Sequence, residues 1–308
     1  MLKITVLLSS YNGEKFIKEQ LDSILEQDVQ DIAELKILVR DDGSKDGTHE
    51  ILNEYKNKGL LSWYTGENLR PARSFWHLMN NCDDSDFYAF CDQDDVWKKD
   101  KLSRAIKLLR EKKQDTPLLY CSSVTIVDAE LKKIGELDCQ NRTSDDFAQS
   151  LIYSIAPGCT FVFNNSARAE LSKYDIEKNY TLIHDWLAHK IIAMKGEIIF
   201  DNYQSMLYRQ HGNNQIGSEK KGLKSFLKKV KRFLHGDSTG VRSEVAQALL
   251  SVYGNELKKS SKEYNYLYIV ANYKQDRKLK KQFLKEEAFY TKTKKDKFLR
   301  TLIRMNKV

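Results

Sequence analysis

The chain has 308 residues, 41% of them hydrophobic, which is enough to fill the core of one large domain or of one domain with an appendage. It has no apolar run near the ~20 residues of a membrane span and no signal-peptide pattern at the N-terminus, so we expect a cytoplasmic protein that does not cross a bilayer. The net charge of +8 combines an acidic body, with 27 basic and 35 acidic side chains over residues 1–219, and a basic rear part that carries +7 over 220–235 and +9 over 274–308.

The first 130 residues alternate between strand-like and helix-like patterns. The opening stretch, residues 2–8, is a nearly continuous apolar run, which is typical of a strand buried on both faces. Apolar residues then recur at helical spacing before the next apolar run. This alternation predicts an α/β fold with a parallel or mostly parallel sheet flanked by helices. Further strands are expected at residues 35–39, 61–65, 87–91 and 118–127, and helices at 16–25, 51–55, 72–79 and 100–109.

Polar clusters follow three of these strands. SSYNG comes after the first strand, DDGS after the second, and DQDD after the fourth. In such sheets ligands bind at the carboxyl ends of the strands, where all three clusters would lie. The pattern alone therefore predicts a ligand site at this edge of the sheet.

The acidic cluster of Asp92, Asp94 and Asp95 allows two interpretations. Carboxylates packed at the end of a buried strand repel one another and are costly to desolvate, so either solvent screens them or a cation lies among them. Two or three such groups can hold Mg²⁺ or Mn²⁺, which prefer oxygen ligands, together with a diphosphate. The alternative is a solvated acidic loop.

The DDGS cluster is also open to two interpretations. An aspartate at the end of the second strand can accept a hydrogen bond from a base or a ribose, or the four residues can form an ordinary turn. The sequence contains neither G-x-G-x-x-G nor G-x-x-x-x-G-K-[ST], so neither of these phosphate-binding loops is available.

The pattern becomes less regular in the second half of the chain. Asp185, at the start of a predicted helix, is either a general base that faces a cleft or a helix N-cap. His211, in a predicted loop, is either a metal ligand or a surface histidine. The elements expected here are a turn leading into a strand at 156–164, a helix at 184–194, a strand at 196–202 and a loop at 208–217.

The stretch KKGLKSFLKKVKRFLH, residues 220–235, combines an apolar helical face with a basic opposite face. This pattern is typical of a helix that lies in a membrane interface, where lysines meet anionic lipids. The alternative is a helix that packs against a domain and exposes a basic back. The last 35 residues, with apolar side chains among lysines, form either a second such helix or a frayed tail.

The motifs occur in an order that resembles glycosyltransferase family 2. They are LLSSYNGEKFIKEQLDSIL, DDGSKDGT, CDQDDVW, PGCTFVFN, HDW and YRQHGNN. The succession is most similar to the bacterial branch that contains the rhamnosyltransferases of polysaccharide assembly. The resemblance implies a GT-A catalytic domain over residues 1–217, followed by a basic, mainly helical region over 218–308 that associates with a membrane or packs on the domain.

The resemblance implies a divalent metal, Mn²⁺ or Mg²⁺, as cofactor. Asp94 would bind the metal most directly, Asp92 would reach the ribose or the metal shell, and His211 would complete that shell near the diphosphate. Asp185 would be the catalytic base, on the opposite side of the sugar from the metal. One displacement with one base inverts the configuration of the sugar carbon.

The resemblance also implies a pocket for the nucleotide-sugar donor. Asp42 would accept a hydrogen bond from N3–H of uracil or thymine, and Asp41 would support the turn. Ser9 and Tyr11 would line the nucleotide pocket. Gln93, inside the D-x-D motif, belongs to the same predicted donor-binding set.

The segment after the third strand departs from the family pattern. The family often has a glycine and an asparagine there, whereas this chain reads ENLRPARSFW. Arg70 or Arg73 either contacts phosphate or belongs to a solvated face.

The predicted function is an inverting hexosyltransferase that moves L-rhamnose from dTDP-rhamnose onto a saccharide acceptor. The acceptor is expected to be lipid-linked, in capsule or cell-wall polysaccharide assembly. The enzyme would lie on the inner face of the plasma membrane, whose anionic surface would meet the basic region. The alternative donor is a UDP-hexose, namely UDP-galactose, UDP-glucose or UDP-N-acetylglucosamine.

Two hypotheses come from other classes. One is a nucleic-acid-binding protein that uses the basic segments, but the acidic body and the absence of a nucleic-acid motif argue against it, so no nucleic-acid partner is expected. The other is a catalytically inactive scaffold, against which the intact DQD and HDW motifs speak. A homodimer is compatible with the sequence.

Overall fold

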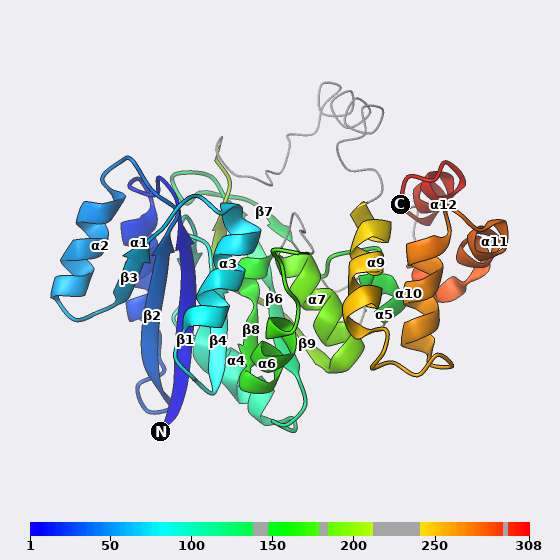
Figure 1. The fold of residues 1–308 in the computed structure, drawn as a ribbon. Helices are drawn as coiled ribbons and strands as arrows, with labels where there is room; N and C mark the ends of the chain where they lie inside the picture. Colours follow the sequence, from blue (N-terminus) through cyan, green and yellow to red (C-terminus); the bar gives the residue numbers. More distant parts are fainter. Residues whose placement is uncertain (138–146, 179–183, 212–240, 292–294) are drawn as a thin grey trace. The chain divides into compact units, whose positions relative to one another are not determined.

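The chain folds into a mixed sheet flanked by helices, as seen in the computed structural model (Figure 1). The α/β fold class expected from the alternating pattern is therefore confirmed. The structure describes residues 1–137, 147–178, 184–211, 241–291 and 295–308.

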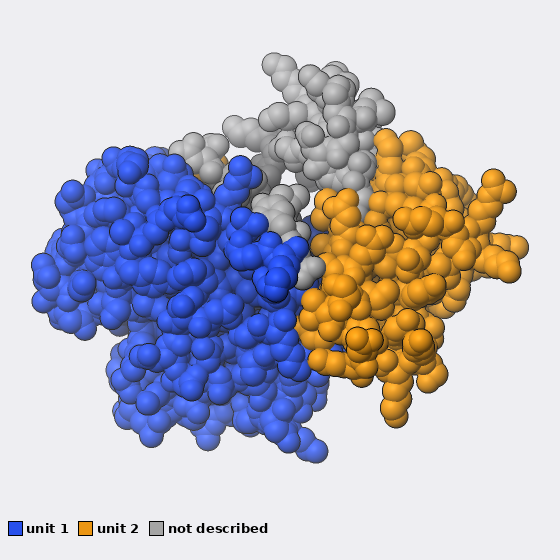
Figure 2. All heavy atoms as spheres, in the orientation of Figure 1, with its two compact units in different colours: residues 1–145, 154–210 blue, residues 146–153, 211–308 orange. Residues whose placement is uncertain are grey.

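The described residues form two compact units (Figure 2). Unit 1 comprises residues 1–145 and 154–210, and contains the sheet. Unit 2 comprises residues 146–153 and 211–308. The domain boundary expected at 217 lies outside the described residues, so it stays a prediction.

The described part of unit 1 contains a sheet of nine strands. They are β1 (Leu2–Ser10), β2 (Ala33–Asp41), β3 (Ser62–Thr65), β4 (Phe87–Cys91), β5 (Val96–Trp97), β6 (Leu118–Val127), β7 (Lys133–Leu137), β8 (Val162–Asn164) and β9 (Glu197–Arg209). The strand order is β3-β2-β1-β4-β8-β6-β9-β5, with β7 paired to β6. The neighbouring strands β3, β2, β1 and β4 pair in parallel, and so do β6 and β9. The other pairs are antiparallel.

Parallel pairing brings the three polar clusters to one edge of the sheet. In the register of β1 and β2, Ser10 lies opposite Asp41. In the register of β1 and β4, Leu8 lies opposite Cys91. The residues that follow these strands therefore leave the sheet at the same edge, as the sequence predicts.

Helices cover both faces of the sheet (Figure 1). One layer includes α3, which packs on β1, and the other includes α1 and α4. The helices of unit 1 are α1 (Ile17–Leu25), α2 (Thr48–Asn57), α3 (Arg70–Asn81), α4 (Lys101–Arg110), α6 (Asn165–Ser172) and α7 (His184–Lys195), with a 3₁₀ turn η1 (Gly158–Thr160).

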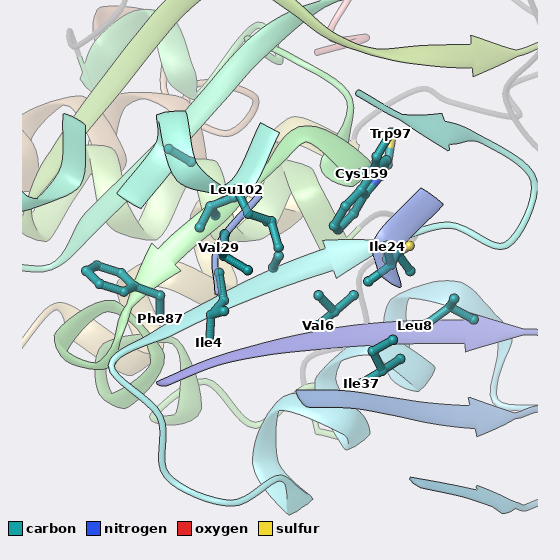
Figure 3. Packing of buried hydrophobic residues seen from close by; sticks show 14 of the residues in the cluster. Ile4, Val6, Leu8, Ile24, Val29, Ile37, Phe87, Trp97, Leu102 and Cys159 are labelled. Carbon is teal, nitrogen blue, oxygen red and sulfur yellow. The ribbon is translucent and has the colours of Figure 1, made fainter. Parts of the chain in front are cut away.

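The core of unit 1 explains why β1 is apolar along its length. Ile4, Val6 and Leu8 point into one cluster together with Ile24 of α1 (Figure 3). Leu7, which alternates with them, is also fully buried. Both faces of the strand are therefore covered, as in other strands of parallel sheets.

The described part of unit 2 is helical. It contains α5 (Phe147–Ser150), α9 (Val241–Tyr253), α10 (Lys262–Asn272), α11 (Arg277–Lys285), a 3₁₀ turn η2 (Glu287–Phe289) and α12 (Lys295–Arg304). Among the described helices, we find none with the length and apolarity needed to cross a membrane. The interfacial helix expected at 220–235 lies outside the described residues.

The prediction of a loop at 208–217 is wrong for its first two residues. Strand β9 continues through Tyr208 and Arg209, where it pairs with Ile126 and Val127 of β6. Polar and glycine residues further along this stretch suggested a loop, but β-pairing to a neighbouring strand overrides local composition. Residues 212–217 of the expected loop are outside the described part.

Candidate active site

The loop after β1 is tied to the loop after β4 by Gln93. Its Oε1 atom accepts hydrogen bonds from the Ser10 hydroxyl (3.0 Å) and the Tyr11 amide (2.9 Å), and its Nε2 donates to the Tyr11 carbonyl (3.0 Å). A Cβ atom on Gly13 would lie 2.4 Å from Gln93 Oε1, so a larger residue there would displace the Gln93 side chain. Gln93 therefore positions the predicted nucleotide loop, and the exposed Tyr11 ring stays available for a ligand.

The DDGS turn is organised by Asp41. Its carboxylate accepts hydrogen bonds from the amides of Gly43 (3.0 Å) and Ser44 (2.8 Å), the Ser44 hydroxyl (2.5 Å) and His49 Nε2 (2.7 Å). Burial alone would raise the pKa of Asp41, but these hydrogen bonds hold it below the usual value. Gly43 has a φ of +79°, which the turn requires of a glycine. Asp41 thus has the geometry of a turn-supporting residue.

Asp42 is buried at the start of the same turn. It forms an ion pair with Arg40 and accepts a hydrogen bond from the Leu69 amide (3.0 Å) just before α3. Burial lowers the pKa of Arg40, whose Nη2 atom also donates to the Glu67 carbonyl (2.9 Å). A carboxylate offers about four acceptor positions, so a base N–H can still share Asp42. Arg40 was not anticipated, although the sequence RDDGS contains it.

Two carboxylates of the acidic cluster after β4, Asp92 and Asp95, lie close to Cys159. Ligand atoms of Asp92, Asp95 and Cys159 all lie within 4.8 Å of one another. Burial, and then repulsion from Asp94 and Asp185, raises the pKa of Asp92 to about 7. Burial and the charges of Asp94 and Asp92 raise the pKa of Asp95 well above its usual value.

This cluster fits a divalent cation. Asp95 is 1% exposed, and its Oδ2 atom accepts no hydrogen bond from the described residues. An unsatisfied buried carboxylate oxygen among repelling carboxyls is costly unless a proton or a cation neutralises it. The close group consists of Asp92, Asp95 and Cys159, while Asp94 is near enough to raise the pKa of both carboxyls. The metal ligands that the resemblance implies do not include Asp95, although it belongs to the predicted acidic cluster, and the sequence analysis does not single out Cys159.

Arg209, at the end of β9, supports this acidic loop. Its amide donates to Asp95 Oδ1 (2.9 Å), its Nε donates to the Asp94 carbonyl (2.8 Å), and its Nη2 pairs with Glu19 of α1. The side chain is almost fully buried and lies over the Phe16 ring. The motif YRQHGNN contained this arginine, but the sequence did not show what it would contact.

Tyr208, beside Arg209, faces the cluster. Burial, and then the nearby Cys159, Asp92, Asp95 and Asp94, raises the pKa of its hydroxyl. A phenol that stays protonated can donate a hydrogen bond to a carboxylate or a phosphate. Tyr208 is therefore a second residue of this site that sequence reasoning did not single out.

Asp185 opens α7 and is held by η1. Its Oδ2 accepts from the Gly158 amide (3.1 Å), and its Oδ1 accepts from the Trp186 amide (2.7 Å). Burial raises the pKa of Asp185 to about 6, against those backbone hydrogen bonds and the charge of Lys190, which lower it. Its charge also acts on Asp92, so both groups lie within one electrostatic site.

His184 is a packing residue rather than an acid or base. Burial lowers the pKa of His184 to about 3, so the ring stays neutral at physiological pH. The ring stacks on Phe75 (centroids 4.1 Å apart) and meets the edge of Phe90. Within the HDW motif, His184 is thus a packing residue, and Asp185 stays the candidate base.

The other predicted residues lie at varied positions. The Ser9 hydroxyl donates to Ser74 Oγ (2.8 Å) on α3. Arg70 is exposed, with a φ of +64°, and Arg73 pairs with Glu177 (3.3 Å). His211 belongs to unit 2, so its role as a metal ligand stays a prediction.

Comparisons with known proteins agree with this arrangement. The family model described as Glycosyl transferase family 2 matches residues 5–167. A dTDP-rhamnosyl transferase, RfbG of Shigella flexneri, is 32% identical over 240 residues, which cover 73% of this chain and 77% of the relative. A poly(ribitol-phosphate) beta-N-acetylglucosaminyltransferase, TarS of Staphylococcus aureus, is 30% identical over 129 residues, 40% of this chain and 22% of the relative.

Solved structures show the same fold. Residues 1–349 of TarS in complex with UDP-GlcNAc match with a TM-score of 0.57 at 18% identity, covering 98% of this chain and 91% of the other. The mannosyltransferase PcManGT from Pyrobaculum calidifontis, in complex with GDP-Man and Mn²⁺, matches with a TM-score of 0.52 at 17% identity, covering 98% and 84%. At these identities the likeness concerns the fold alone.

Proposed function

Because this chain belongs to glycosyl transferase family 2 and is a glycosyltransferase of GT-A fold, we propose that it moves L-rhamnose from dTDP-rhamnose onto a saccharide acceptor with inversion. The donor is proposed from the likeness to the dTDP-rhamnosyl transferase. The observation that carries the mechanism is the placement of a carboxylate cluster and a separate carboxylate with raised pKa in one electrostatic site. Such a pair supplies a cation site and a base.

Asp92 and Asp94 would hold the divalent metal, Asp95 and Cys159 lie in the same cluster as Asp92, and His211 stays a candidate ligand. When bound, Mn²⁺ or Mg²⁺ neutralises the charge that develops on the nucleoside diphosphate as it leaves. Arg209 fixes the backbone of this loop, so its carboxylates are positioned before the donor binds. Tyr208 would add a hydrogen-bond donor toward the diphosphate.

Asp185 would act as the base. The proton of the attacking acceptor hydroxyl passes to a carboxylate oxygen of Asp185 while the sugar–phosphate bond breaks on the opposite face. The Gly158 amide holds that carboxylate in place. Because the acceptor oxygen attacks in a single displacement on the face opposite the leaving diphosphate, the configuration of the sugar carbon inverts, and one base is sufficient.

The nucleotide would bind at the ends of β1 and β2. Asp42 would accept from N3–H of the base, and Asp41 would keep the turn rigid through its hydrogen bonds. Ser9 and Tyr11 would line the pocket, and Gln93 would hold the Tyr11 backbone.

A second candidate donor is a UDP-hexose, proposed from the partial sequence likeness to TarS, a beta-N-acetylglucosaminyltransferase whose solved structure is a complex with UDP-GlcNAc. A thermal-shift panel of dTDP-rhamnose, UDP-glucose, UDP-galactose and UDP-N-acetylglucosamine, each with Mn²⁺ or Mg²⁺, separates the donors. The largest stabilisation is expected with dTDP-rhamnose, since a bound ligand raises the unfolding free energy. A larger shift with a UDP-sugar would replace rhamnose in this proposal.

Two substitutions test the site. Asp94→Ala and Asp185→Asn are each expected to lower kcat by at least about a hundredfold, because they remove the metal ligand and the base. The melting temperature should stay near that of the unmodified protein. Ordinary turnover in either variant would mean that the site is misplaced.

The biological role proposed is extension of a lipid-linked saccharide in capsule or cell-wall polysaccharide assembly. The protein would lie peripherally on the cytoplasmic face of the plasma membrane. Residues 1–217 would form the catalytic domain and 218–308 the membrane-associated region. No nucleic-acid partner is proposed.

A further inference from the structure

Helix α12 in unit 2 exposes two large apolar side chains. Phe298 is 57% exposed and Met305 is 46% exposed. They are seven positions apart, and the Met305 amide donates to the Thr301 carbonyl (3.1 Å), so helical geometry continues to Met305. Both side chains therefore lie on one side of the helix.

Basic side chains border these two residues. Lys297 and Arg304 are exposed on the same side of the helix, and Thr301 lies between Phe298 and Met305. These five residues, Lys297, Phe298, Thr301, Arg304 and Met305, are called the α12 face here.

The opposite side of α12 is firmly packed. Leu299, Leu302 and Ile303 are buried. Lys280 of α11 donates to the Arg304 carbonyl (2.7 Å) and to Asn306 Oδ1 (2.8 Å), which secures the end of the helix. The α12 face is thus the outer side of a docked helix, not part of a frayed tail.

The surroundings of this helix are strongly basic. Residues 274–308 contain 13 basic and four acidic side chains. On α11, Arg277, Lys278, Lys281 and Lys285 are exposed, and the helix contains no acidic residue. A partner of this surface must therefore be anionic and must also accept apolar side chains.

We propose that the α12 face binds the surface of an anionic phospholipid bilayer. Phe298 and Met305 would enter the boundary between headgroups and acyl chains, and Lys297 and Arg304 would meet lipid phosphates. A second copy fits poorly, because a two-fold contact would bring like charges together. A nucleic acid would use the charges but offers no apolar phase for the exposed Phe298 and Met305 side chains.

This inference deepens the proposed function and rests on it in one respect. An enzyme that extends a lipid-linked acceptor gains from being held where that acceptor lies. The binding itself depends on unit 2 alone, so it can be measured without turnover.

Co-sedimentation of the full chain with vesicles tests the proposal. Wild-type protein is expected to bind vesicles that contain phosphatidylglycerol, and to bind pure phosphatidylcholine vesicles at least about tenfold more weakly. Phe298→Ser with Met305→Ser should weaken binding to the anionic vesicles at least about tenfold, since inserted apolar area is lost. Lys297→Gln with Arg304→Gln should weaken it about fivefold for each charge removed.

Ile134→Ser is the matched control. Ile134 is 56% exposed on β7 of unit 1. Its substitution therefore removes a comparable apolar side chain that does not belong to the α12 face. This variant should bind anionic vesicles as the wild type does. Circular dichroism should show the same helix content in all variants.

Several results would overturn the inference. The serine double variant could bind anionic vesicles as well as the wild type does. The wild type could bind neutral vesicles as well as anionic ones, or it could prefer duplex DNA to anionic vesicles. Donor turnover measured without vesicles keeps the two proposals apart. If the wild-type protein binds anionic vesicles but does not turn over the donor, the proposed function is rejected and the proposal for the α12 face still holds.

Discussion

Burial shifts the pKa of Asp185 toward the range that suits the base role proposed for it. An exposed aspartic acid has a pKa near 4, whereas burial raises that of Asp185 to about 6. A base with a pKa closer to neutrality accepts a proton more readily while remaining mostly ionised at physiological pH. The two backbone amides that bind its oxygens keep the pKa from rising further.

This pKa predicts an acidic limb in the rate profile. Below about pH 6 Asp185 is protonated and cannot accept the acceptor proton, so kcat/KM for the acceptor should fall about tenfold per pH unit. The carboxyl of Asp92, with a pKa of about 7 in the free protein, titrates in the same range. Rates are therefore measured at saturating donor and metal, which keep Asp92 ionised. A rate that stays constant down to about pH 5 would exclude Asp185 as the titrating base.

Gly158 is the residue that allows Asp185 to approach η1. A Cβ atom at this position would lie 2.8 Å from Asp185 Cβ and 2.8 Å from His184 Nε2. Gly158→Ala should therefore displace the base and lower kcat by about a hundredfold, while donor affinity stays the same. Steady-state rates and donor titration calorimetry provide the two readouts.

Gly135→Ala is the control for that substitution. A Cβ atom there would only touch Ile126 Cδ1 at 3.9 Å, so the activity should not change. Unchanged kcat in the Gly158→Ala variant would show that turnover does not depend on the close approach of Asp185 to Gly158.

At the scale of elements, the end of strand β9 supports the shape of the acidic loop after β4. Arg209 reaches two carbonyls, one carboxylate of the loop and one of α1, so it joins three segments distant in sequence. Arg209→Lys keeps the charge and the backbone amide contact to Asp95, but it cannot reproduce the directed guanidinium contacts to the Asp94 and Ala129 carbonyls and to Glu19. We expect Mn²⁺ affinity to fall by about ten- to a hundredfold, as for other residues that support metal ligands.

Mn²⁺ titration followed by electron paramagnetic resonance measures that change. Arg104→Lys is the control, since Arg104 forms an equally directed pair with Asp201 (2.5 and 3.2 Å) away from the acidic loop. A lower melting temperature with unchanged Mn²⁺ affinity would mean that Arg209 stabilises the fold without shaping the site.

The elements also show what a local pattern can predict. Strands β1 to β4 and β6 follow from apolar runs, and Asp42 and Asp92 can be placed at strand ends, because parallel strands share one carboxyl edge. The short β5 and the edge strand β7 have no comparable pattern. β5 pairs with β9, a partner far along the chain, and β7 turns back onto the preceding strand β6.

At the scale of the whole molecule, the charge division has a structural counterpart. Unit 1 contains the acidic loop and Asp185, while the exposed basic helices α11 and α12 belong to unit 2. Residues 146–153 also belong to unit 2, which a boundary drawn along the sequence does not anticipate. The Asp296 carboxylate accepts from Tyr153 (3.4 Å), one of the contacts that link this short segment to the rest of the unit.

The sequence by itself determined the fold class, the family resemblance, the edge of the sheet that carries the site and most of its acidic residues. These follow from short-range periodicity and from residue types that one chemistry requires. Only the tertiary structure decided that Cys159 and Asp95 join Asp92, that Arg209 supports them and that Gly158 holds Asp185. Such contacts join residues tens of positions apart, and their distances depend on the packing of the whole sheet rather than on any local pattern.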